Sequence, residues 1–219
     1  MSAGREFEAT TKGEHMDDLQ GFLERLASAA PTPGGGSAAA LGAAAAAALL
    51  AMVTRLAAKR HPSRQDIGDR LLPSAESLLD EMRSAARDDA LAYGQVLDAY
   101  RLPKGNEEEL RARAQAIHEA LEGAAAVPSS VGHAANRVLR QCEETAEIAP
   151  PFAASDLAVA VHLAWAALQG AVENVRANQR ALRDPSARTR LEDDAEALLV
   201  EGRRAYEDAI RATSALTKR

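Results

Sequence analysis

Apolar residues recur at intervals of three and four positions along most of the chain, which is the period of an α-helix. In the segment DDLQGFLERLAS, four residues (Leu19, Phe22, Leu23 and Leu26) share one stripe, so a short amphipathic helix is predicted to begin at Asp17. No stretch alternates apolar and polar residues with β-branched side chains, so no strand is predicted. Further helices are predicted at about 37–60, 64–100, 107–126, 128–147, 155–182 and 187–216.

Prolines mark most boundaries between these helices. His61-Pro62 ends the helix at 37–60, and Val127-Pro128, Pro150-Pro151 and Asp184-Pro185 separate later pairs. Pro73 lies inside the helix at 64–100, where a break or kink is expected because proline removes an intrahelical hydrogen bond. The pattern predicts an all-α, single-domain, up-and-down bundle of about six or seven helices.

The composition indicates how such a bundle packs. Hydrophobic residues make up 47% of the 219 positions but aromatic residues only 3%, so the core has to consist mainly of Ala, Leu and Val. The segment 37–52 is the extreme case, because it is mostly alanine and leaves room for neighbouring helices to approach its backbone. We expect it to form a central, buried helix. Residues 1–15 lack apolar periodicity and are expected to be a disordered leader before a helical domain at 16–219.

Charge and cysteine content narrow the functional classes. The net charge of −6 argues against a general nucleic-acid binder, which needs a surplus of Lys and Arg. The apolar run from Ala38 to Val53 is shorter than the roughly 20 residues that span a bilayer, and no signal peptide is evident. The single cysteine, Cys142, excludes an internal disulfide and has no setting that would make it reactive. A cytoplasmic protein without nucleic-acid or membrane partners is expected.

The segment PTPGGGS, from Pro31 to Ser37, stands immediately before the alanine-rich helix. Ser37 is predicted to be the N-cap of that helix, and the glycine amides together with the helix dipole form a possible anion site. A simple turn explains the same residues. A nucleotide-hydrolase loop would need a Gly-Lys-Ser/Thr ending, and a dinucleotide fold would need a preceding strand; the sequence has neither.

Four polar residues stand in otherwise apolar or small-residue helices. Asp156, beside the expected cap Ser155, either complements a helix dipole or handles protons, whereas Asp89 lies mid-helix on either a solvated face or a site. Asn174 and Asn178 share one helix face and form either a ligand-binding amide pair or a polar seam between helices.

Lysine and histidine side chains are the other candidates for a site. Lys59, at a helix end, either stabilises the helix terminus or contacts an anionic ligand. The five histidines lack the spacing of metal ligands, so no metal site is expected. Among them His162, between two apolar residues, is the one that we would mutate.

Several of these segments together resemble the formiminotetrahydrofolate cyclodeaminase and methenyltetrahydrofolate cyclohydrolase family. The likeness opens with FLERLAS and PTPGGGSAAAL and covers about residues 17–182 in order and rough spacing. The other matching stretches are Met52-Val53 with Lys59, DALAY at 89–93 with AYRLPK at 99–104, Val127-Pro128, and SD at 155–156 followed by GAVENVRAN at 170–178.

The resemblance implies a helical subunit that forms a homodimer, with a folate pocket near the glycine loop and no prosthetic group. Its substrate would be a tetrahydrofolate derivative: such an enzyme either closes a formimino group into the methenyl ring with loss of ammonia or opens that ring with water. Asp156 and Asp89 become the candidate acid/base residues. The implied substrate-binding residues are Thr32, Pro33, Gly34, Gly35, Gly36, Ser37, Lys59, Asn174 and Asn178.

Three departures from the family pattern support a second interpretation. Arg55 stands where an asparagine is expected, Ala58 replaces the glycine before Lys59, and a proline-rich segment with Pro150-Pro151 replaces the Gly-Asn before SD. A catalytically degenerate relative that serves as a folate-binding or structural helical dimer therefore remains the alternative to an active enzyme. A turnover assay on methenyltetrahydrofolate separates the two.

Overall fold

The computed structural model describes residues 19–60 and 65–218. It divides into a unit that ends at Gly34 and a unit that begins at Gly35, and each is described by itself. In the first unit residues 19–26 are helical, as predicted, and the following turns contain a cis peptide bond between Thr32 and Pro33. The expected start of this helix at Asp17, the leader at 1–15 and the expected stop at residues 61–62 lie outside the described residues.

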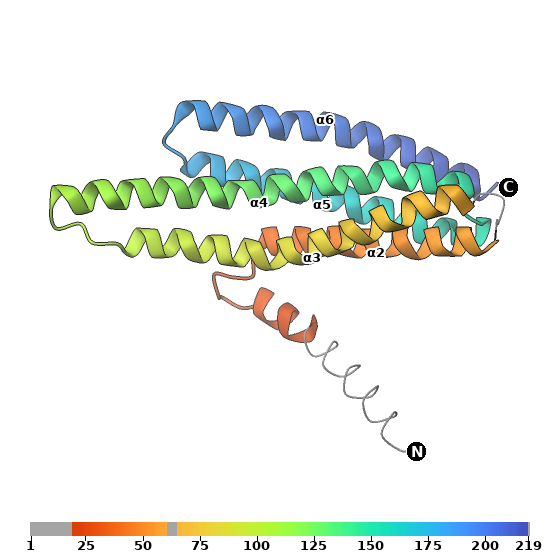
Figure 1. The fold of residues 1–219 in the computed structure, drawn as a ribbon, viewed down its shortest axis with the longest axis horizontal. Helices are drawn as coiled ribbons and strands as arrows, with labels where there is room; N and C mark the ends of the chain where they lie inside the picture. The colour runs from red at the N-terminus through yellow and green to blue at the C-terminus, as the bar shows by residue number, and fades with distance from the viewer. Residues whose placement is uncertain (1–18, 61–64, 219) are drawn as a thin grey trace, which may run out of the picture. The chain divides into compact units, whose positions relative to one another are not determined.

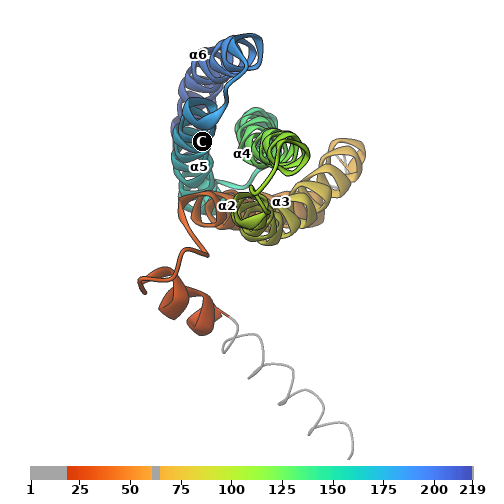
Figure 2. The same cartoon turned by 90° about the vertical axis from the view of Figure 1, so that its left-hand side faces the viewer.

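The second unit is an up-and-down bundle of long helices, which confirms the predicted all-α class (Figure 1). The α4 helix packs against all four other long helices, and it lies inside the arc that they form when the bundle is seen end-on (Figure 2). The described residues contain no strand. The elements are α2 (Gly35–Arg60), α3 (Gln65–Arg101), α4 (Glu107–Ile148), the short 3-10 helix η2 (Pro151–Ala153), α5 (Ala154–Ala181) and α6 (Pro185–Leu216).

Small residues let α2 and α5 pack closely in opposite directions. A Cβ atom added at Gly170 of α5 would lie 3.4 Å from the Cβ of Ala39, and one added at Gly42 of α2 would lie 3.8 Å from the Cβ of Ala167. Both distances are ordinary van der Waals contacts, so the two backbones are about one methyl group apart. The α2 helix packs against α3, α4 and α5, and its core-facing alanines are fully buried.

The α4 helix runs through Pro128 without a break, so the predicted boundary between helices at 107–126 and 128–147 is wrong. Proline lacks the N–H that would bond the carbonyl four residues earlier, which is that of Ala124. The side chain of Asn178 on α5 fills this gap, because its Nδ2 donates to the Ala124 carbonyl at 2.8 Å. A contact between helices thus replaces the missing bond within α4, which no local sequence pattern reveals.

The α3 helix also continues through its proline. Pro73 lies inside α3, which is one continuous helix from Gln65 to Arg101, so no break occurs there. The carbonyl that loses its partner belongs to Asp69, which is exposed, and water can bind it. An exposed position therefore lowers the cost of a proline inside a helix.

Two predicted caps are wrong. The α2 helix begins at Gly35, so Ser37 lies in its first turn and not at the cap. The α5 helix begins at Ala154 after η2, and the residue at its cap, Ala153, has no side-chain bond to the helix. Ser155 is exposed in the first turn. In both places a small residue begins the helix earlier than the hydroxyl residue does.

Within the described residues, two helices are long and apolar enough to cross a membrane by length and composition alone, α2 and the segment Pro151–Ala181. The α2 helix meets this test because its 26 residues extend beyond both ends of the run from Ala38 to Val53. Within the bundle, 56% of the apolar window of α2 and 44% of that of the second segment are buried. Their apolar character is therefore accounted for in large part by packing against neighbouring helices.

Candidate active site

The first turn of α2 holds a carboxylate from α3 directly against its backbone. A Cβ atom at Gly36 would lie 2.6 Å from Cγ of Asp89, which is closer than any real side-chain contact. None of the described glycines has a positive φ angle. Gly36 is thus required because Asp89 approaches the backbone closely, and not because the turn needs a left-handed residue.

Asp89 is tied to this position by a hydroxyl group. The Oγ of Ser37, which is fully buried, donates to Oδ2 of Asp89 at 2.8 Å. The amino-terminal end of α2 also carries unpaired N–H groups and a partial positive charge, which favour a carboxylate there. The hypothesis that Asp89 lies on a solvated helix face is therefore wrong. Its side chain is half-buried and accepts a hydrogen bond from a neighbouring helix.

The two asparagines of α5 take different roles. A Cβ atom at Gly35 would lie 3.5 Å from Nδ2 of Asn174, so this amide borders the start of α2. Asn174 Nδ2 donates to the carbonyl of Gly170 on its own helix at 2.7 Å. Asn178 donates to α4, where it replaces the bond that Pro128 lacks, as a polar seam between helices would. Asn174 is therefore the member of the pair that borders Gly35, the residue before the glycine that faces Asp89.

Lys59 and Asp156 lie at the opposite end of the bundle. Lys59 is exposed at the end of α2, about 36 Å along the axis from Gly35 at about 1.5 Å per residue. Asp156 is half-buried in the first turn of α5, and it lies about 27 Å from Asn174 along the axis of α5. Within one chain the structure thus brings together Gly35, Gly36, Ser37, Asp89 and Asn174, and it does not bring Lys59 or Asp156 to them.

The loop residues Thr32, Pro33 and Gly34 belong to the first unit. They are described apart from the bundle, so their predicted role in substrate binding stays a prediction. The three departures from the family pattern lie near Lys59 and Asp156. Arg55 forms an ion pair with Glu76 on the surface, Ala58 packs against Gly68 of α3, and the proline pair begins η2, the short helix before α5. None of them contacts the group around Asp89.

Other reactive side chains lie apart from this group. His162 is exposed, and its Nδ1 lies 3.1 Å from the hydroxyl of Tyr206 on α6. Cys142 is fully buried, and burial raises the pKa of its thiol far above the ordinary value, as expected of an inert cysteine. Across residues 19–60 and 65–218, no three His, Cys, Asp or Glu side chains gather in a way that could hold a metal ion.

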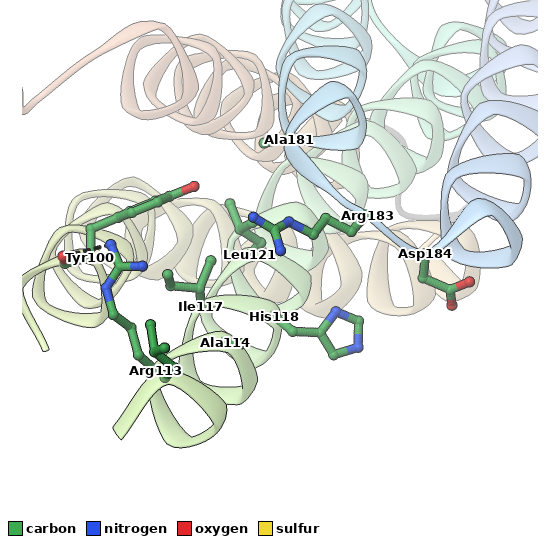
Figure 3. Close-up of a pocket in the computed structure, with 10 residues that line it drawn as sticks. Tyr100, Arg113, Ala114, Ile117, His118, Leu121, Ala181, Arg183 and Asp184 are labelled. Carbon is green, nitrogen blue, oxygen red and sulfur yellow. Dashed lines mark hydrogen bonds between the residues drawn. The ribbon is translucent and has the colours of Figure 1, made fainter. Parts of the chain in front are cut away.

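Sequence reasoning missed a cavity of about 540 Å³ at the end of the bundle (Figure 3). It lies between the end of α3, the first half of α4, and the connection from α5 to α6. Its apolar side chains recur on α4 at helical spacing, a signal that by itself predicts only a helix. The lining residues are Tyr100, Leu110, Arg113, Ala114, Ile117, His118, Leu121, Ala181, Arg183 and Asp184.

The fold and the group around Asp89 define an all-α protein with a carboxylate held at a glycine-rich helix start. A family model described as formiminotransferase-cyclodeaminase matches residues 18–197. The chain belongs to this family. It is 36% identical over 187 residues to a methenyltetrahydrofolate cyclohydrolase of Methylorubrum extorquens, an alignment that covers 84% of this chain and 90% of that protein.

Two further comparisons agree with this family membership. The chain is 30% identical over 168 residues to the formimidoyltransferase-cyclodeaminase of Mus musculus, and the match covers 76% of this chain but only 31% of that longer relative. The crystal structure of formiminotetrahydrofolate cyclodeaminase from Thermotoga maritima superposes with a TM-score of 0.79 at 26% identity. That match covers 90% of this chain and 96% of the other.

Proposed function

We propose that this protein is a folate one-carbon enzyme that opens methenyltetrahydrofolate with water to give 10-formyltetrahydrofolate. The observation that carries the proposal is the Asp89 carboxylate, which is bonded to Ser37 and lies against Gly36, next to the glycine that Asn174 borders. Support for the hydrolytic reaction comes from the Methylorubrum extorquens relative, which is named for it and matches over nearly its whole length.

The reaction places clear demands on such a site. The methenyl carbon is part of a delocalised cation between two nitrogens, and water adds to it with loss of a proton. The bond from this carbon to N5 then breaks as N5 gains the proton that the new hydroxyl group loses. N10 keeps the formyl group, and one proton is released overall. Asp89 can stabilise the cation and accept the proton of the attacking water, while Ser37 holds one of its oxygens in place.

A second candidate reaction is ring closure of formiminotetrahydrofolate. There N10 attacks the formimino carbon, and ammonia leaves from the tetrahedral intermediate after it has gained a proton. The same carboxylate could carry that proton. The likeness to the Thermotoga maritima cyclodeaminase over 96% of its length favours this candidate.

The wild-type protein distinguishes these reactions directly. Methenyltetrahydrofolate hydrolysis is followed by the loss of its near-ultraviolet absorbance, and formiminotetrahydrofolate closure by the release of ammonia. We expect faster turnover of methenyltetrahydrofolate. Ammonia release without hydrolysis would favour the cyclodeaminase, and folate binding with no turnover of either substrate would favour the degenerate helical dimer.

We also propose that the protein acts as a homodimer through the outer faces of α2 and α5. On these faces Ala45, Ala48 and Met52 of α2 are exposed, together with Val159 and Ala166 of α5. Met52 is 37% and Val159 48% exposed. A second copy is the partner that supplies the same apolar face, since a two-fold interface pairs one surface with itself.

Such a dimer would also complete the set of predicted site residues. If the two-fold axis crosses α2 near its middle, the two copies of α2 run antiparallel. Asp156 of the partner subunit then lies toward the glycine start of α2, about 18 Å nearer along the helix axis than Asp156 of the same chain. This arrangement keeps a role for Asp156 and Lys59 although they lie far from Asp89 within one chain.

Mixing two inactive variants tests this arrangement. Asp89→Asn and Asp156→Asn chains, unfolded and refolded together, would form mixed dimers in which one of the two sites has both carboxylates. About a quarter of the native turnover should return, because about half of the dimers are mixed. A monomer mass in light scattering, or no recovery from a mixture shown to contain mixed dimers, would contradict the proposal.

A further inference from the structure

The cavity at the end of the bundle combines an apolar floor with cationic side chains. Its floor is formed by apolar residues of α4, among them Ile117 and Leu121, and Tyr100 of α3 forms one wall. In Figure 3 the guanidinium group of Arg183 extends over this floor from the opposite side. A flat ring can lie against such a floor while a negatively charged group reaches the rim.

Arg113 is held at this cavity by contacts with Tyr100, but not all of its hydrogen-bond donors have partners. Its guanidinium group lies 5.7 Å from the centre of the Tyr100 ring, and Nη2 donates to the Tyr100 carbonyl at 3.1 Å. Its Nε is buried without a hydrogen-bond partner among the described residues. A buried donor without a partner is costly, so an acceptor supplied by a ligand would be favoured there.

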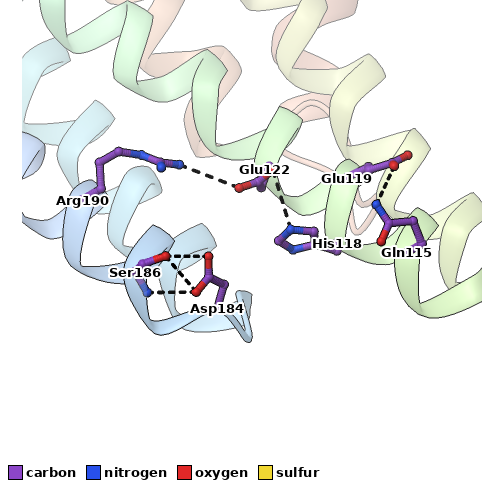
Figure 4. A network of polar contacts seen from close by, with 7 residues as sticks. All are labelled: Gln115, His118, Glu119, Glu122, Asp184, Ser186 and Arg190. Atoms are coloured by element: carbon purple, nitrogen blue, oxygen red, sulfur yellow. Dashed lines mark hydrogen bonds and ion pairs between the residues drawn. The ribbon is translucent and has the colours of Figure 1, made fainter. Parts of the chain in front are cut away.

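Most other charged side chains at the cavity already have hydrogen-bond or ion-pair partners. Asp184 caps α6 and accepts hydrogen bonds from Ser186 at 3.0 and 2.8 Å, which lower the pKa of its carboxyl group (Figure 4). His118 lies 3.8 Å from Glu122, which also lies 3.8 Å from Arg190. Arg183, by contrast, has no ion-pair partner within the described part of the chain.

The cavity lies next to the candidate active site. Ala181, on the cavity wall, is about 10 Å from Asn174 along the axis of α5, with Asn178 between them. Asn178 binds the carbonyl of Ala124, which is one turn of α4 beyond Leu121. An elongated ligand with its reacting head at Asp89 can therefore extend its other end into this cavity.

We propose that this cavity holds the aminobenzoyl-glutamate tail of the folate substrate. The benzoyl ring lies against Ile117 and Leu121, and the glutamate carboxylates are bound by Arg113 and Arg183. The inference rests on the proposed folate reaction. It assigns the tail to arginines of the same chain as Asp89, whereas that chain's own Lys59 lies about 36 Å from Gly35 along α2.

Two substrates and three variants test the assignment. Methenyltetrahydrofolate carries the tail, whereas methenyltetrahydropteroate has the same reacting head and no glutamate. We expect Arg113→Gln to raise KM for the first substrate about tenfold or more and Arg183→Gln about threefold. Arg113 is half-buried and Arg183 exposed, and charged hydrogen bonds are stronger at the less exposed side chain. Both changes should raise KM much less for the truncated substrate, whose tail keeps only the carboxylate on the benzoyl ring, and kcat should stay near native.

The control is Arg111→Gln, which removes an exposed arginine of α4 that pairs with Glu107 and does not line the cavity. It should leave KM for both substrates unchanged. Calorimetric titration with p-aminobenzoyl-glutamate provides a readout without turnover, and binding should weaken in Arg183→Gln. Circular-dichroism melting identifies any variant that fails to fold, and the surface variant Arg183→Gln keeps the test decisive.

The possible failures are distinct. If the wild-type protein turns over neither substrate, the proposed function fails. If it turns over methenyltetrahydrofolate but both arginine variants keep native KM and native affinity for p-aminobenzoyl-glutamate, the cavity does not hold the tail. Equal KM increases for the two substrates would also contradict the assignment, since the truncated substrate cannot contact these residues through a glutamate.

Discussion

Adding one methyl group at Gly36 should displace Asp89 and reduce turnover. The new Cβ would lie 2.6 Å from Asp89 Cγ, so the carboxylate has to move and its bond to Ser37 is lost. Loss of such a charged hydrogen bond costs about 1.5–3 kcal/mol when buried, and the lower value applies to the half-buried Asp89. Alanine is favoured over glycine at a helical position by about 0.4–1 kcal/mol, so the net loss of stability is about 0.5–1 kcal/mol.

Turnover should change far more than stability. A displaced base typically costs about 10²-fold or more, so Gly36→Ala should lose this much turnover of methenyltetrahydrofolate while its melting temperature falls by no more than about 4 °C. Gly94→Ala is the matched control on α3, because a Cβ there meets no atom of the described residues within 4 Å. A Gly36→Ala protein with native turnover would refute the placement of Asp89 in the reaction.

Three further predictions concern single residues. Asn178→Ala should lower the free energy of unfolding, measured in urea, by about 1–2 kcal/mol because the Ala124 carbonyl loses its hydrogen-bond partner. The loss should be smaller in a Pro128→Ala background, which restores an N–H for that carbonyl, and an equal loss there would contradict this role of Asn178. Cys142 should resist a thiol reagent in the native protein and react in denaturant, whereas rapid native labelling would contradict its burial. The carboxyl of Asp184 has a lower pKa folded than unfolded, so Asp184→Asn should reduce stability at neutral pH, with a difference from wild type that shrinks as the pH falls below the ordinary value of 3.8 and through the lowered pKa; a constant difference in urea unfolding would be inconsistent.

The helical class and most helix positions could be predicted because the spacing of apolar residues reflects which side of each helix faces the core. The predicted break at Pro128 failed for a reason that lies outside local sequence. The bond that proline removes is replaced by Asn178, a residue 50 positions later whose neighbours give no sign of this partnership. Helix starts at Gly35 and Ala154 were also missed, since small residues can begin a helix without a side-chain cap.

The site could be predicted in part. Residue type and resemblance point to the glycines, Ser37, Asp89 and Asn174, and the structure places all but the loop residues up to Gly34 in one group. Asp156 and Lys59 lie at the other end of the bundle because α2 and α5 run antiparallel. Residue spacing alone does not reveal this direction. The tail cavity was missed because Arg113 and Arg183 come from helix and connection segments that meet only in the folded bundle.

Turnover of methenyltetrahydrofolate by the wild-type protein and by Asp89→Asn tests the proposed role of Asp89 in a folate one-carbon enzyme most directly. Asparagine keeps the size of the side chain and can still accept a hydrogen bond from Ser37, but it can neither accept the proton nor stabilise the cation. We expect an active wild-type protein, and a variant with nearly native melting whose turnover is lower by about 10²-fold or more. An active wild-type protein whose Asp89→Asn variant turns over at the native rate would contradict the proposed role of Asp89.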